Sequence, residues 1–127
     1  MRVVESSRVF NAVELYSLTR NPESINMKTA AGSVICVNDW CIFTDVQEEG
    51  EKTLLSISAP DVNGERITYT TNSDTFIREF KYALDLCAEC GENLIAVKVI
   101  AGKSKSDRDF ITCALVDSQP FLENATS

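Results

Sequence analysis

The chain has 127 residues, a formal net charge of −7 and no histidine. Hydrophobic residues make up 44% of it and charged residues 24%, as in a single globular domain. The acidic balance argues against non-specific binding of duplex DNA, which requires a broad basic face. No apolar run is long enough to cross a membrane, no signal-peptide core follows Met1, and the five cysteines are an odd number. We therefore expect a reduced, cytoplasmic protein without membrane partners.

The N-terminal region predicts an amphipathic helix from about 7 to 19. Ser6 and Ser7 are suitable residues for its start, and Pro22 cannot continue it. Its apolar stripe consists of Val9, Ala12, Val13 and Tyr16, at helical spacing. We interpret residues 22–32 as a connector, so that 1–32 precede the main fold. The stripe would either cap the domain or form a contact in a homo-oligomer, and the pattern leaves both open.

The next three predicted elements are strands, over 33–46, 52–58 and 65–71. The first is rich in β-branched and aromatic residues, but its apolar residues occupy both odd and even positions and do not alternate with polar ones. We therefore expect a long strand with a bulge near Asn38 and Asp39. An acidic turn over 47–51 separates the first two strands, and a turn over 60–64, which ends in Asn-Gly, separates the last two.

The apolar period then changes from two to about 3.6 residues, which predicts a helix from 74 to 90. Ser73 is a good cap residue before it, and Gly91 is a good residue for its end. Two further strands are predicted, over 93–101 and 109–116, joined by a polar hairpin loop over 102–108. The small polar residues 118–127 are expected to form a flexible tail.

Three strands, a helix and a two-stranded hairpin follow each other in the order of a five-stranded OB-type barrel. We therefore predict a mostly β, α+β domain in which residues 33–117 form an OB-like barrel, with one helix before the barrel and one between its third and fourth strands. A split βαβ unit or a helix-backed meander would also fit these elements.

The predicted hairpin loop concentrates three cations, Lys103, Lys105 and Arg108, in an otherwise acidic chain. Lys98 lies just upstream, and Phe110 lies at the base of the loop. In an OB barrel this loop contacts single-stranded nucleic acid, where cations bind phosphates and an aromatic ring stacks on a base. The alternative interpretation is a solvated hairpin tip.

Two aromatic residues and two more cations complete the predicted nucleic-acid interface. Trp40 on the first strand and Tyr69 on the third would offer rings for base stacking. Lys52 and Arg66, on the second and third strands, would contact phosphates. The alternatives are core packing for the rings and ordinary edge charges for the cations.

Four cysteines offer an alternative of another kind, a structural zinc site. Cys87 and Cys90 have the spacing of a zinc half-site, and Cys36 and Cys41 have four residues between them. Three of the four lie in apolar stretches, where reduced cysteines serve as small hydrophobic residues, so we expect no metal and no cofactor. The chain also lacks histidine, a nucleophile elbow and a Gly-rich phosphate loop, so we do not expect an enzyme.

Four segments carry a resemblance to a known class of proteins. They are Leu54-Leu55-Ser56-Ile57, the run from Tyr69 to Phe80, Gly102-Lys103-Ser104-Lys105 and the run from Arg108 to Cys113. Together they resemble small single-stranded DNA-binding proteins of phages and mobile elements. The resemblance implies an OB-type protein that coats single-stranded DNA in replication or recombination, with Lys103, Lys105 and Arg108 as loop contacts.

The acidity of the chain supports a second hypothesis, a small phage-type protein that binds and inhibits a host protein. The charge of −7 and the acidic turn over 47–51 motivate it, together with Glu5, Glu14 and Glu23. Carboxylates on a surface mimic a phosphate backbone and complement a basic partner.

Overall fold

The computed structural model describes residues 1–61, 63–92 and 95–117. This part of the chain is mostly β, with two α-helices and eight strands. In chain order the elements are β1 (Arg2–Ser6), α1 (Ala12–Thr19), β2 (Ile25–Asn26), the 3₁₀ helix η1 (Met27–Ala30), β3 (Val34–Val37), β4 (Asp39–Gln47), β5 (Gly50–Pro60), β6 (Arg66–Thr71), α2 (Asp74–Glu89), β7 (Ile95–Lys103) and β8 (Asp109–Val116). Neither helix is long and apolar enough to span a bilayer.

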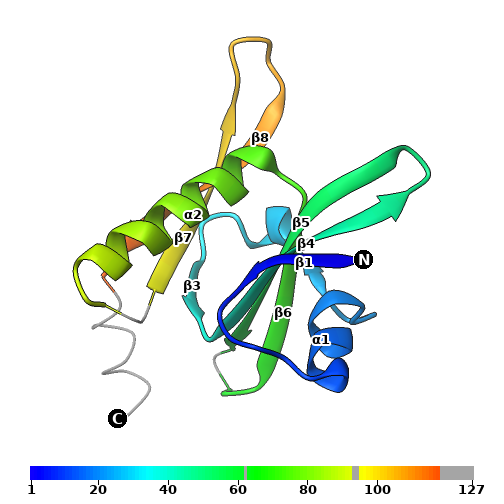
Figure 1. The fold of residues 1–127 in the computed structure, drawn as a ribbon. Coiled ribbons are helices and arrows are strands. Elements are labelled where there is room, and N and C mark those ends of the chain that lie inside the picture. Colours follow the sequence, from blue (N-terminus) through cyan, green and yellow to red (C-terminus); the bar gives the residue numbers. More distant parts are fainter. Residues whose placement is uncertain (62, 93–94, 118–127) are drawn as a thin grey trace.

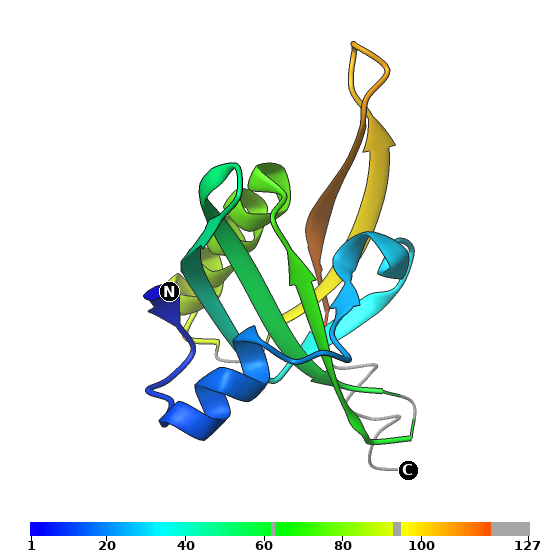
Figure 2. The ribbon, with the colours of Figure 1, turned by 90° about the vertical axis from the view of Figure 1, so that its right-hand side faces the viewer.

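The strands form two sheets, with the orders β1-β4-β5-β6-β2 and β3-β7-β8 (Figures 1 and 2). All neighbours are antiparallel except β2 and β6, which run parallel. In the described residues β6 pairs with β5 and β2, and β8 pairs with β7 alone, so no closed barrel forms. The five-stranded barrel expected from the sequence is therefore not confirmed, because β2 occupies the edge of β6 that closure would need.

The segment expected to form one bulged strand instead contains two strands in two different sheets. Asn38 alone separates β3, which pairs with β7, from β4, which pairs with β5. At this bend the backbone N–H of Asn38 donates to the carbonyl of Ser58 at 2.9 Å. Apolar residues occupy both odd and even positions because β4 is covered on both faces. Ile42 belongs to the main core, and Phe43 belongs to a smaller cluster under α1.

The main core lies between α2, the two sheets and η1. Phe76 and Phe80 of α2 are fully buried in it, and Met27 of η1 fills it from the segment that the sequence indicated as a plain connector. Residues 74–89 form α2, close to the predicted range, with Ser73 accepting a hydrogen bond from the Phe76 N–H at 3.2 Å. Gly91, at φ +73°, ends the helix in the left-handed region that favours glycine.

The N-terminal helix begins later than predicted, and the expected apolar stripe is exposed rather than packed on the domain. Residues 2–6 form β1 at the edge of the larger sheet, and α1 begins only at Ala12. The helix is started by a capping box, in which Asn11 and Glu14 bond each other's backbone N–H. The expected stripe faces outward, with Val9, Val13 and Tyr16 exposed by 93%, 75% and 68%. Leu18 packs inward instead, on Cys41 and Phe43. The expected strand start at 93–94 and the tail over 118–127 lie outside the described residues.

Candidate nucleic-acid interface

The β7–β8 hairpin projects from the body of the molecule (Figures 1 and 2). Its loop is closed by a bond from the Ser104 N–H to the Arg108 carbonyl and one from the Asp107 N–H to the Ser104 carbonyl, both 2.9 Å. The Ser104 hydroxyl also accepts from the Arg108 N–H at 3.3 Å. Asp107 adopts a φ of 60°, a left-handed conformation that aspartate tolerates better than most residues. The loop is therefore an ordered turn that holds its charged side chains in solvent.

The cations of this loop are exposed but partly neutralised by their neighbours. The segment 103–109 contains the three cations Lys103, Lys105 and Arg108 and the two carboxylates Asp107 and Asp109, so its net charge is only +1. Lys103 Nζ lies 3.6 Å from Asp107 Oδ1, and both side chains are more than half exposed. An exposed pair of this kind contributes little to stability and leaves the lysine available to a phosphate.

The strand register defines an outer hairpin face, the side of β7–β8 turned away from α2. It consists of Lys98, Ile100 and Gly102 on β7 and, directly opposite, Ala114, Thr112 and Phe110 on β8. The other side packs against α2, where the Cys113 thiol donates to the Phe76 carbonyl at 3.8 Å. Two predicted residues, Lys98 and Phe110, thus share one face of the hairpin.

Phe110 lies over the backbone of Gly102. A Cβ at Gly102 would stand 2.8 Å from the ring's Cζ, so only glycine leaves room for the ring in this position. The ring remains 36% exposed, and Ile100 beside it on β7 is 38% exposed. Sequence reasoning missed Ile100 and Thr112, although period-2 counting from Phe110 and Lys98 would have placed both on the same face.

The two other predicted aromatic residues belong to the core. Register places Trp40, Ile57 and Tyr69 side by side across β4, β5 and β6, on the face turned to α2. Trp40 meets Phe80 edge-to-face, with ring centroids 5.7 Å apart. Both predicted rings are half-buried and pack against the core, which was the alternative to base stacking.

Lys52 and Arg66 lie apart from the hairpin and from each other. Lys52 is on the β4–β5 hairpin, where its Nζ pairs with Glu49 Oε2 at 2.9 Å. Arg66 begins β6, beside Pro60 at the opposite end of β5. The nine predicted residues are therefore distributed over three regions of the surface and the core.

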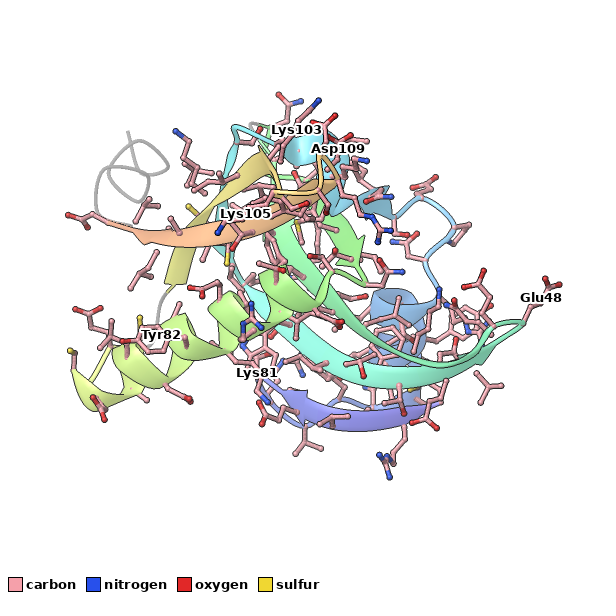
Figure 3. All side chains as sticks on the ribbon, turned by 90° about the horizontal axis from the view of Figure 1, so that it is seen from above. Glu48, Lys81, Tyr82, Lys103, Lys105 and Asp109 are labelled. Carbon is pink, nitrogen blue, oxygen red and sulfur yellow. The ribbon has the colours of Figure 1, made fainter. Side chains whose placement is uncertain are left out.

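The β4–β5 hairpin also projects, with an opposite charge. Residues 45–52 contain four carboxylates and one lysine, a net charge of −3. Figure 3 shows Glu48 extending from the end of this hairpin, while Lys103, Lys105 and Asp109 mark the other one.

The cysteines are not brought together. Cys41 lies under α1, Cys87 lies in the main core, Cys36 is on β3 and Cys90 follows α2. The described residues hold no group of three or more side chains suited to a metal ion. Burial raises the pKa of the Cys41 thiol to about 11 and that of the Cys113 thiol, which also faces Glu79, to about 12, so both stay protonated near neutral pH.

Searches against protein-family models, curated proteins and solved structures find no match for this chain.

Proposed function

We propose that this protein binds single-stranded DNA through the tip and outer face of the β7–β8 hairpin. The observation that carries the proposal is the coincidence on one projecting element of exposed cations, Lys103, Lys105 and Arg108, with a partly exposed ring, Phe110, held over Gly102. Single strands require this combination, since phosphates bind cations and every base offers a flat face for stacking. A role in replication or recombination of a phage or mobile element rests on the sequence resemblance alone.

The connectivity supports an OB-type relation as part of this proposal. We interpret β3 and β4, joined at Asn38, as one bent first strand that belongs to both sheets. The antiparallel order β4-β5-β6, then α2, then the β7–β8 hairpin follows the OB sequence of elements. In that relation β7–β8 corresponds to the hairpin between the fourth and fifth barrel strands, one of the two whose loops bind nucleic acid.

The N-terminal helix restricts where a strand of DNA would lie. OB domains also bind through the outside of their second and third strands. Here α1 packs across β4 and onto β5, where Leu54 joins the cluster that Leu18 forms with Cys41 and Phe43. The proposal therefore assigns the strand to the outer hairpin face, which no described helix covers.

Fluorescence anisotropy with labelled oligo-dT at two salt concentrations tests the proposal. We expect binding that weakens steeply with salt, because bound cations release counterions from the phosphates. Replacing Lys103, Lys105 and Arg108 together by alanine should weaken binding and lower the salt slope by about 2, at roughly 0.7 per phosphate contact on a single strand.

A charge-matched control separates a local contact from a general charge effect. The Arg2→Ala, Arg20→Ala, Arg78→Ala variant loses the same three positive charges from β1, the end of α1 and α2. It should retain the salt slope of the unmodified protein. Absence of oligo-dT binding at low salt, or an equal loss in both triple variants, would refute the proposal.

The acidic hairpin favours a second candidate function, binding of a basic protein partner. Register places Glu48 and Glu49 in the turn of this hairpin and Glu51 beside it, and Figure 3 shows Glu48 at the projecting end, as a phosphate mimic would require. This function predicts a complex with a basic protein that is lost when these three residues become glutamine, and no binding of oligo-dT.

A further inference from the structure

A cleft of about 380 Å³ lies between α1 and the outer face of β4, β5 and β6, apart from the hairpin. Its volume falls in the range of small-molecule sites, roughly 300–1,000 Å³. The N-terminal segment supplies the apolar part of its lining, Phe10, Val13 and Leu18, together with the polar residues Arg8, Glu14, Ser17 and Asn21. The sheet supplies a polar row, in which register places Asp39, Ser58 and Thr68 side by side.

The hydroxyl of Ser58 indicates that the cleft receives a polar ligand. Ser58 is only 3% exposed, and its Oγ finds no hydrogen-bond partner among the described residues. Its neighbour Thr68, 7% exposed, has one long hydrogen bond, from Asn21 Nδ2 at 3.5 Å. A buried hydroxyl without a partner is unfavourable, so two adjacent ones with spare capacity fit a partner that enters from the cleft.

The charges around the cleft select a neutral ligand. Arg8 donates to both available carboxylates, with Nη2 2.6 Å from Glu14 Oε2 and Nε 3.2 Å from Asp39 Oδ1. This triad carries one net negative charge, and Arg66 at the edge of the cleft carries one positive charge. The two positive and two negative side chains of the lining cancel, so the cleft offers neither an anion nor a cation a net attraction, and a neutral molecule fits this balance.

We propose that this cleft binds a neutral, hydroxyl-rich small molecule of the monosaccharide or polyol class. The hydroxyls of Ser58 and Thr68 give and accept hydrogen bonds with the ligand's hydroxyl groups, and the carboxylate lone pairs and Arg66 extend the same network. The C–H face of the ligand packs on Val13 and on Phe10, whose ring has the Arg8 guanidinium 4.5 Å from its centroid.

Amide chemical-shift mapping of the full chain tests this assignment, with D-glucose, D-ribose and myo-inositol as neutral probes. At least one of them should cause saturable shifts at Asn21, Ser58 and Thr68. Acetate and inorganic phosphate should not. If no neutral probe shifts these amides, or if an anion binds there instead, the proposed ligand class is wrong.

Two serine variants on the same face of β5 sharpen the test. Ser58→Ala removes no side-chain hydrogen bond among the residues that the structure describes, so it should fold normally and bind the polyol about tenfold more weakly. Ser56→Ala is the matched control: it loses the contact of its hydroxyl with Thr70 at 3.4 Å but leaves the cleft intact, so polyol binding should not change. Equal polyol affinity of Ser58→Ala and the unmodified protein would overturn the assignment. Ser58→Ala should also bind oligo-dT normally, which separates this site from the hairpin.

Discussion

The two projecting hairpins have the same architecture but differ in charge and in packing. The β4–β5 hairpin is acidic at its tip, and its stem is covered on both sides: Ile42 and Leu55 face the main core, and Phe43 and Leu54 face α1. The β7–β8 hairpin carries the cation-rich tip; one face of its stem packs against α2, and among the described residues Lys98 and Ile100 of the other face are exposed. A stem buried on both faces serves stability, whereas an open face leaves side chains available for a ligand.

The largest effect expected from this difference is on stability. Leu55 is fully buried, and Leu55→Ala should lower the free energy of unfolding by about 2–5 kcal/mol, because it leaves a cavity in the core. Ile100, on the open face of β7, is 38% exposed, so Ile100→Ala should cost less than about 1 kcal/mol. Urea denaturation of both variants measures the difference. Similar losses would show that the two stems are packed alike.

The next effect concerns the ring on the open face. Phe110→Ala should weaken oligo-dT binding by roughly fivefold to a hundredfold, the equivalent of about 1–3 kcal/mol for one stacked base. Tyr82→Ala is the control, because Tyr82 is an exposed ring on α2, 66% exposed and outside the hairpin. If both variants bind as the unmodified protein does, Phe110 is only a packing partner of Gly102.

Much of this comparison was predictable from the sequence, because its signals are local. Turn residues predicted both hairpin loops, and the helical period of Phe76, Phe80 and Cys87 predicted α2. β1 and β2 were missed, because they are short and form only by pairing with strands distant in the sequence. The start of α1 was misplaced because Ser6 and Ser7 resemble cap residues, yet Ser7 bonds Asp39 and Trp40 across the sheet.

The site was predictable in part, for the same reason. The loop cations belong to one turn, so their proximity followed from the sequence. Trp40 and Tyr69 could not be distinguished from surface rings, because alternation does not reveal which face of a strand meets the core. The cleft beside α1 has no local signal either, since Arg8, Ser58 and Arg66 come from three separate segments.

A smaller effect should come from the acidic hairpin. Replacing Glu48, Glu49 and Glu51 by glutamine removes three negative charges that repel a phosphate backbone. Affinity for oligo-dT should rise by about two- to fivefold at low salt, and the gain should shrink as salt screens the repulsion. Anisotropy titrations at two ionic strengths measure it. A loss of affinity would mean that this hairpin takes part in binding and would remove the functional contrast between the two tips.

The smallest effect concerns α1, which packs on one face of the β4–β5 stem. The Arg8 guanidinium and the Asn11 N–H hydrogen-bond the Glu14 carboxylate and hold its pKa below its usual value of 4.5. A depressed pKa in the folded state means that the contribution of Glu14 to stability is present above the unfolded pKa and is lost as the pH falls through the folded one. Glu14→Gln should therefore lower Tm slightly near neutral pH, and its Tm should converge with that of the unmodified protein once the pH falls below the depressed pKa of Glu14. Thermal scans across this range test the convergence.

Amide exchange in acid tests whether Glu14 acts by keeping α1 in place over the β4–β5 hairpin. Exchange should increase at Cys41 and Phe43, which lie under α1, and stay slow at Val99 and Cys113, which lie under α2. Equal increases in both hairpins would mean that protonation of Glu14 does not act through α1.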